Sequence, residues 1–131
     1  MKRRHFAGWV GSLPLAAMPL AWAQPKSIQI IVPFGPGGSG DISARMFADF
    51  ITRKTGQAVV VENRPGANGN IGSDFVSKSA PDGYTLLVSG VGSQGINATL
   101  YRSMPYDIVE GLTHIGMIAK GPNALVINPA F

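Results

Sequence analysis

The sequence predicts an α/β fold with a largely parallel sheet flanked by helices. An apolar strand over 28–34 leads through a glycine-rich turn into a helix over 41–55, and a valine-rich strand follows over 58–62. A strand, a helix and a strand within about 35 residues form a βαβ unit, whose two strands are parallel with a right-handed crossover. The composition, 45% hydrophobic against 14% charged, is typical of a globular chain rather than a disordered one.

The helix over 41–55 is indicated by apolar residues at helical spacing. They predict one broad apolar face, made of Ile42, Met46, Phe47, Phe50 and Ile51. Asp41 is a suitable N-cap, because a carboxylate can accept hydrogen bonds from the free N–H groups of the first turn. Gly56 stands where the C-terminus of a helix favours a left-handed residue.

Later elements are separated by glycine and proline turn signals. The strand over 58–62 is almost purely valine, which predicts a strand covered on both faces. The remaining predicted elements are a loop over 63–69, a helix over 70–79, a turn at 81–83, a strand over 84–88, a loop over 89–95, a helical turn over 96–101, a loop over 102–112 and strands over 115–119 and 124–127.

Three successive predicted strands each end in a loop of small residues. In an open parallel sheet the carboxyl ends of the strands share one edge, and ligands bind at that edge. Glycines let backbone N–H groups approach a ligand, and the N–H groups at a helix start carry partial positive charge. The arrangement therefore predicts an anion site. Glycines that only form tight turns are the alternative.

Residues 1–23 are typical of a secretory signal peptide. Lys2, Arg3 and Arg4 precede a short apolar run that ends in an A-x-A cleavage site at Ala23. A retained membrane anchor is the alternative, but the run is too short for a spanning helix and contains prolines. The arginine pair leaves twin-arginine export open beside ordinary secretion.

The formal charge of +4 belongs mainly to this leader. Without residues 1–23, eight Lys and Arg (11 minus 3) stand against seven Asp and Glu, which leaves about +1. Nucleic-acid binding needs a basic stripe, so it is not predicted. The remaining chain has one histidine, His114, and no cysteine. These are too few for a metal site or a nucleophilic catalytic arrangement, so neither a metal nor an enzyme is predicted.

The first glycine loop also satisfies G-x-G-x-x-G through Gly35, Gly37 and Gly40. Glu62 ends the second strand, where a dinucleotide fold places its ribose-binding acid. Against this reading, Asp41 puts a negative charge where a pyrophosphate would lie. An exported, nucleotide-binding (Rossmann-like) oxidoreductase fragment therefore stays an alternative function.

Several long motifs resemble one family. They are VPFGPGGSGDISAR, ENRPGANGNIG, APDGYTLL, GSQGINATLY and MPYD. Together they resemble the extracytoplasmic solute-binding proteins of tripartite tricarboxylate transporters, the Bug family. The resemblance implies a periplasmic-binding-protein-like fold of type II, with two α/β domains around a cleft. Residues 24–131 would form an N-terminal part of domain one, incomplete here, with domain two absent from this sequence.

The resemblance also implies a function and a set of site residues. The protein would capture a small organic carboxylate in the periplasm, without a cofactor, as a monomer that delivers it to integral-membrane transporter subunits. The implied ligand-binding residues are Phe34, Gly37, Gly38, Ser39, Ser93 and Asn97. Those expected to shape the site are Asp41, Asn63, Arg64 and Gly66. Gln94 and Gly95 depart from the commoner family residues. A non-functional truncation is a further alternative.

Overall fold

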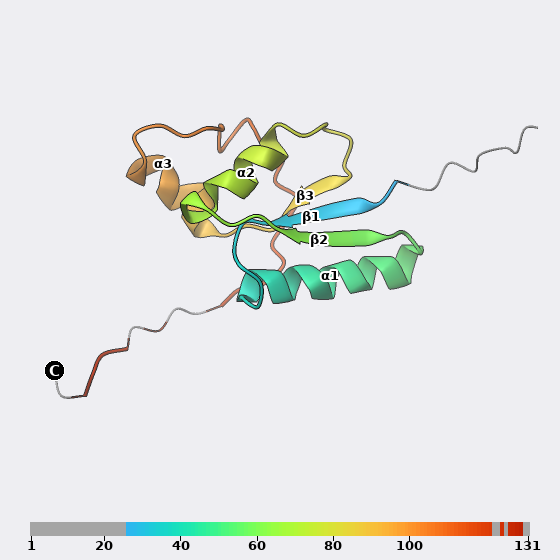
Figure 1. Cartoon of the computed structure of the whole chain (residues 1–131), viewed down its shortest axis with the longest axis horizontal. Helices are drawn as coiled ribbons and strands as arrows, with labels where there is room; N and C mark the ends of the chain where they lie inside the picture. The colour runs from blue at the N-terminus through green and yellow to red at the C-terminus, as the bar shows by residue number, and fades with distance from the viewer. Residues whose placement is uncertain (1–25, 122–123, 125, 130–131) are drawn as a thin grey trace, which may run out of the picture.

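The computed structural model describes residues 26–121, 124 and 126–129. Three strands form one sheet in the order β2-β1-β3: β1 is Ile28–Val32, β2 is Val59–Asn63 and β3 is Thr85–Leu87 (Figure 1). Both pairings are parallel, with Ile28 opposite Val59 and Gln29 opposite Thr85. The predicted parallel βαβ unit is therefore confirmed. The predicted signal peptide lies outside the described residues.

Helices cover the sheet on both sides. The long helix α1, Ser39–Thr55, lies below the sheet in Figure 1, and the shorter α2, Asn70–Ser77, lies above it. A 3₁₀ turn, η1 (Ala67–Gly69), leads into α2. A π-helical turn, η2 (Gly92–Ile96), continues directly into α3 (Asn97–Leu100). No helix within the described residues is both long enough and apolar enough to cross a membrane.

The core lies between β1 and α1. Ile30 and Val32 of the central strand are fully buried against Ala44 and Ala48 of the helix. Because alanine carries only a methyl group, the helix axis can approach the sheet closely at these two turns. Ile31 points to the opposite face of β1 and is also fully buried. The central strand is thus covered on both sides, as its apolar sequence requires.

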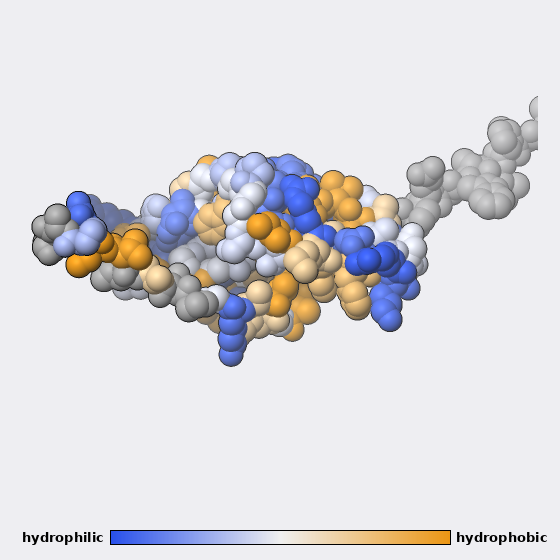
Figure 2. Space-filling model, turned by 90° about the horizontal axis from the view of Figure 1, so that it is seen from below, coloured by the Kyte–Doolittle hydropathy of each residue, from blue (hydrophilic) through white to orange (hydrophobic). Residues whose placement is uncertain are grey.

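The predicted apolar face of α1 is partly wrong. Phe47 packs against the core, but Ile42, Met46 and Phe50 are 53%, 69% and 53% exposed. Figure 2, seen from the side of α1, shows apolar residues gathered on this surface. The helix is rotated so that its small residues and Asp41 face inward, because the Asp41 carboxylate is bonded to the end of β2.

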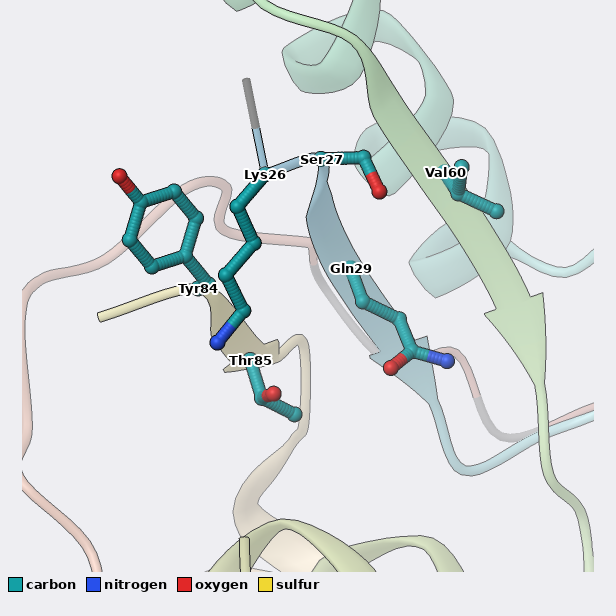
Figure 3. Close-up of a pocket in the computed structure, with 6 residues that line it drawn as sticks. All are labelled: Lys26, Ser27, Gln29, Val60, Tyr84 and Thr85. Carbon is teal, nitrogen blue, oxygen red and sulfur yellow. The ribbon is translucent and has the colours of Figure 1, made fainter. Parts of the chain in front are cut away.

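The predicted burial of the second strand is also wrong. β2 lies at the edge of the sheet, and Val60 is 51% exposed. The short helix α2 packs over β3 and β1, and the amino ends of the strands stay open on that side. A hollow of about 390 Å³ results, lined by Lys26, Ser27, Gln29, Val60, Tyr84 and Thr85 (Figure 3).

Two further predictions differ from the structure. The predicted loop over 89–95 is helical from Gly92 onward. The predicted strand over 115–119 is absent, and the described residues of 124–127 form none either. A strand forms only where a neighbour completes its hydrogen-bond ladder. In the described part of the chain no strand pairs with these residues, and Ile115 is 83% exposed.

We predict that Gly72→Ala destabilises the fold. A Cβ atom at Gly72 would lie 2.8 Å from the Cβ and 3.0 Å from the Cα of Pro33, so α2 would have to move away from the end of β1. Overpacking of this kind costs about 1–3 kcal/mol in the free energy of unfolding. Urea titration measures the loss, and Gly90→Ala, where nothing lies within 4 Å, is the matched control. Equal stability of the two variants would contradict the prediction.

Candidate functional site

Loops from three strands meet at the carboxyl edge of the sheet. A Cβ atom built on Gly69, after β2, would lie 3.1 Å from the Cβ of Ser93, after β3. It would also lie 3.4 Å from Cζ of Phe34, after β1. Gly69 has a φ of +93°, which a residue with a side chain rarely adopts. The predicted convergence of the three loops is confirmed, and a glycine makes it possible.

The loop between β1 and α1 presents the most open part of this edge. Residues 34–39 are exposed, and Gly37 has a φ of +83°. Gly38 is the N-cap of α1, so the helix begins at Ser39 and the predicted N-cap at Asp41 is wrong. Asp41 lies instead in the first turn, where carboxylates are favoured by the free N–H groups.

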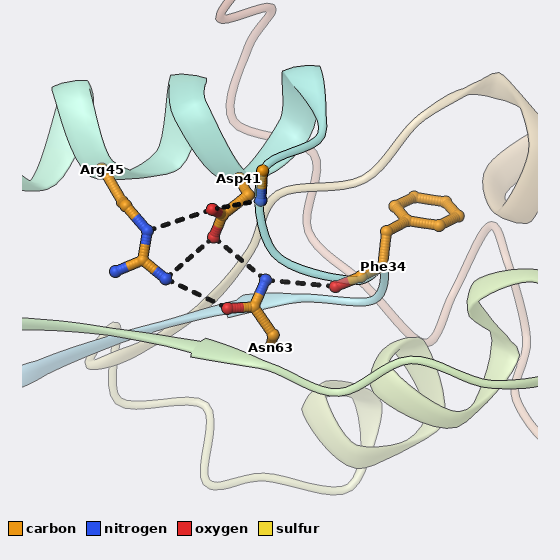
Figure 4. Close-up of polar contacts among 5 residues, drawn as sticks. Phe34, Asp41, Arg45 and Asn63 are labelled. Carbon is orange, nitrogen blue, oxygen red and sulfur yellow. Dashed lines mark hydrogen bonds and ion pairs between the residues drawn. The ribbon is translucent and has the colours of Figure 1, made fainter.

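The Asp41 carboxylate is the centre of a polar cluster (Figure 4). It is nearly buried and accepts a hydrogen bond from the N–H of Gly37 at 3.0 Å. Nε of Arg45, one turn further along α1, donates to Oδ2 at 3.1 Å, and the guanidinium Nη2 lies 3.0 Å from Oδ1. The carboxylate therefore holds the turn of the glycine loop against its own helix.

Asn63 joins this cluster to the end of β2. Its Nδ2 donates to Oδ1 of Asp41 at 3.0 Å and to the carbonyl oxygen of Phe34 at 3.1 Å. Its Oδ1 accepts from Nη2 of Arg45 at 3.1 Å. Both polar atoms of the amide side chain, Nδ2 and Oδ1, are thus hydrogen-bonded within one closed network (Figure 4). The network links β2, the glycine loop and α1.

These contacts stabilise the charged form of Asp41. The hydrogen bond from Arg45 is the largest cause, followed by those from the Gly37 N–H and from Asn63, and together they lower the pKa of Asp41 from 3.8 to about 2. The same contact raises the pKa of Arg45. The first two turns of α1 therefore hold an ion pair beside the loop, in which the negative charge is enclosed and the guanidinium is about half exposed.

Arg64 was expected to shape the site, and its cation is already engaged. Nε donates to Oε1 of Glu62 at 2.6 Å, and the guanidinium carbon lies 3.7 Å from the centre of the Phe75 ring. Gln29 donates to the other Glu62 oxygen at 2.5 Å. Both oxygens of Glu62 are therefore occupied by protein donors. This weakens the dinucleotide hypothesis, which needs that acid for a ribose.

Ser93 and Asn97, both predicted to touch the ligand, are fully buried. Nδ2 of Asn97 donates to Oδ1 of Asn70 at 2.7 Å and to the carbonyl of Asn68 at 3.1 Å. Oδ1 of Asn97 accepts from Nδ2 of Asn68 at 2.8 Å. The side chain of Asn97 has therefore used its donors and its acceptor within the protein.

Ser93 belongs to the same interior. Its hydroxyl is hydrogen-bonded to that of Ser89, and its carbonyl accepts from the Tyr106 hydroxyl at 2.8 Å. In this conformation Ser93 and Asn97 support the loops from behind, and direct contact with a ligand stays a prediction. Asn68, Asn70 and Tyr106, which also belong to this interior, were not predicted as site residues. A signal for Asn68 was its place in a glycine-rich loop, since asparagine tolerates its φ of +52°.

Gly66 shapes the second loop through its backbone. Its φ is +135°, and a Cβ atom there would collide with the side chain of Ile71. The hollow of Figure 3 lies at the amino ends of the strands, away from these loops, and there Lys26 forms an ion pair with Asp82. The described residues contain no group of three or more His, Cys, Asp or Glu side chains that could hold a metal ion.

Comparison with known proteins identifies the family to which this chain belongs. Residues 43–131 match the family described as "Tripartite tricarboxylate transporter family receptor". The chain belongs to this family. Protein BugT of Bordetella pertussis is 47% identical over 105 residues, which are 79% of this chain and 32% of BugT. The chain thus spans about a third of the length of BugT.

Three solved structures agree with this fold. The periplasmic binding protein BugD is 35% identical, with a TM-score of 0.62 over 67% of this chain and 29% of BugD. A Rhodopseudomonas palustris protein solved with adipate is 38% identical, with a TM-score of 0.61 over 63% of this chain and 27% of that protein. MatC from the same species, solved with bound malate, is 32% identical, with a TM-score of 0.61 over 65% of this chain and 29% of MatC. The predicted resemblance and the predicted fold class of the receptor are confirmed.

We predict that Asp41 makes the stability of this chain depend on pH between about 4 and 2. A carboxyl whose pKa falls on folding stabilises the native state above its unfolded pKa of 3.8, and the effect is lost as the pH falls through the folded value of about 2. Denaturant midpoints across this range should fall less steeply in Asp41→Asn than in the wild type. Asp49→Asn, on the exposed side of α1, is the control. If the midpoints of Asp41→Asn and of the wild type fell equally steeply with pH, the prediction would be contradicted.

We also predict that Asn97→Ala destabilises the fold. The substitution removes three hydrogen bonds and leaves the side chain of Asn68, the carbonyl of Asn68 and Oδ1 of Asn70 without this partner. Buried polar groups that lose a partner cost about 1–3 kcal/mol. Urea unfolding measures the loss, and Ala98→Ser, at an exposed position next to Asn97, is the control. Equal midpoints of the two variants would contradict the prediction.

Proposed function

We propose that this chain is part of a periplasmic receptor that captures a small organic carboxylate for a tripartite tricarboxylate-type transporter. The observation that carries the proposal is the exposed glycine loop at the start of α1, whose neighbouring acid is already neutralised by Arg45. Neutral donors at a helix start can hold a carboxylate without a dedicated salt bridge. Family membership supports the same function.

The loop offers donors from its backbone and from one hydroxyl. Ser39 is exposed and begins α1, so its N–H and those of the next residues have no helical partner. Gly38 and the exposed Phe34 flank it. The Gly37 N–H is engaged by Asp41, so in this conformation Gly37 serves the shape of the turn. We place Ser93 and Asn97 behind the loop, where ligand contact would require them to become exposed.

The ligand class follows from chemistry and from relatives. One related protein was solved with adipate and another with malate, and both ligands carry two carboxylates. The loop in this chain provides donors for one carboxylate. The second carboxylate would then lie toward the opposite side of a cleft, which a second domain closes by a hinge motion as in periplasmic binding proteins. A small dicarboxylate is therefore the favoured ligand.

Export and partners complete the proposal. Residues 1–23 would serve as a signal peptide cleaved after Ala23, and residues 24–131 would form an N-terminal part of domain one. The receptor would act as a monomer and hand its ligand to integral-membrane transporter subunits. No catalytic or cofactor role is assigned to it. The nucleotide-binding alternative has less support, because Gln29 and Arg64 occupy the carboxylate of Glu62.

We predict that the purified, complete protein binds malate or adipate with 1:1 stoichiometry and does not bind NAD. Isothermal titration calorimetry measures all three compounds under one set of conditions. Saturable heat with a dicarboxylate is expected because the N–H donors at the exposed start of α1 have no helical partner. Saturable binding of NAD, without binding of either dicarboxylate, would overturn the proposed function.

A pair of serine variants locates the binding loop. Ser39→Ala removes one hydroxyl donor at the start of α1 and should weaken dicarboxylate binding about threefold to tenfold. Ser43→Ala, one turn further along the same helix, is the matched control and should bind as the wild type does. Equal affinities of Ser39→Ala and the wild type would place the ligand away from the Ser39 hydroxyl.

A further inference from the structure

Arg45 is the part of the polar cluster that lies outside the glycine loop. It projects from the second turn of α1 and contacts two groups, the carboxylate of Asp41 and the amide oxygen of Asn63. Both of these groups bond directly to the loop, Asp41 to the Gly37 N–H and Asn63 to the Phe34 carbonyl. Arg45 is thus linked to the loop twice, once through Asp41 and once through Asn63 (Figure 4).

The first consequence is electrostatic. Asp41 places a negative charge in the first turn of α1, at the end of the helix where an anionic ligand would find favourable N–H groups. Without compensation, this charge would repel a carboxylate. Arg45 lies within 3.1 Å of both Asp41 oxygens, so it cancels the charge at its source. Among the described residues no other cation forms an ion pair with Asp41.

The second consequence is geometric. A guanidinium only donates hydrogen bonds, so its contact with Asn63 fixes the amide with its oxygen toward Arg45. The amide nitrogen then points to the Phe34 carbonyl and to Asp41. If the amide turned over, its oxygen would face the Phe34 carbonyl and the Asp41 carboxylate, which are both acceptors. Its nitrogen would face the Arg45 guanidinium, which is a donor. Arg45, together with the Asp41 carboxylate and the Phe34 carbonyl, therefore favours the orientation that ties the loop to β2.

We propose that Arg45 is a positioning residue for carboxylate binding, which neutralises Asp41 and orients Asn63 so that the 34–39 loop can accept an anionic ligand. This inference rests on the proposed function. It assigns no contact between Arg45 and the ligand. The inference depends on charge cancellation. If affinity is lost because the Asp41 charge is uncompensated, removing that charge should restore part of the affinity.

The affinity test uses the complete purified protein with malate and adipate as probes. Arg45→Gln keeps much of the side-chain length but removes the charge, and it should weaken binding about tenfold. Arg53→Gln is the matched control, since Arg53 forms an i,i+4 ion pair with Asp49 on the exposed part of the same helix. The control should stay within about twofold of the wild type. Wild-type affinity in Arg45→Gln would overturn the inference while leaving the proposed function intact.

A double variant separates charge cancellation from simple support of the fold. Adding Asp41→Asn to Arg45→Gln removes the uncompensated negative charge, so part of the lost affinity should return. If Arg45 only supports the fold, the second substitution removes further hydrogen bonds and affinity should fall again. Recovery supports the inference, and a further loss overturns its electrostatic part.

Hydrogen exchange of the ligand-free protein gives a readout that needs no ligand. The Gly37 amide, protected by Asp41, should exchange faster in Arg45→Gln than in the wild type or in Arg53→Gln. Unchanged exchange would overturn the positioning role. If the wild type binds neither dicarboxylate, the proposed function fails, and the exchange result still decides whether Arg45 holds the loop.

Discussion

The hydrogen bonds of one enclosed carboxylate organise the carboxyl edge of this fold. Asp41 binds the Gly37 N–H, Arg45 and Asn63 at once, and these partners come from the glycine loop, from α1 and from the end of β2. An enclosed carboxylate is stable only when its lone pairs are met by donors and its charge by a cation. The requirements of a single side chain thus fix three segments relative to one another. The same contacts set the rotation of α1, which buries its alanines and exposes Ile42, Met46 and Phe50.

Close approach of backbones complements this polar centre. Gly72 lets α2 lie against Pro33 at the end of β1, and Gly69 lets the second loop reach Ser93 and Phe34. Behind these contacts, Asn97 joins Asn68 and Asn70 through hydrogen bonds that leave none of its own polar atoms free. The loops are therefore supported from within by a satisfied polar interior. Such support keeps the neutral donors of the loops in place at low reorganisation cost.

Much of the edge could be predicted from the sequence, and its interior could not. The glycine pattern between apolar runs predicted parallel strands with loops on one edge, because local spacing carries that information. Ser93 and Asn97 were predicted as ligand contacts, but the structure buries both, since burial depends on how α3 packs behind η1. Arg64 was expected to shape the site, and the structure shows its guanidinium bonded to Glu62 and stacked on Phe75, contacts that the sequence does not reveal. Asp41 and Arg45 are four residues apart on one helix, but the contact between Arg45 and Asn63, 18 residues away, depends on how β2 lies beside α1.

The sequence by itself determined the strand–loop–helix order, the parallel pairing and the family resemblance, because these depend on local propensity and on long motifs. Only the tertiary structure decided which face of α1 is buried, that β2 is an edge strand with Val60 exposed, and that residues 115–119 are not a strand. Each of these depends on a neighbour far away in the chain. An apolar stripe is buried only where another element covers it, and an apolar run becomes a strand only where another strand pairs with it.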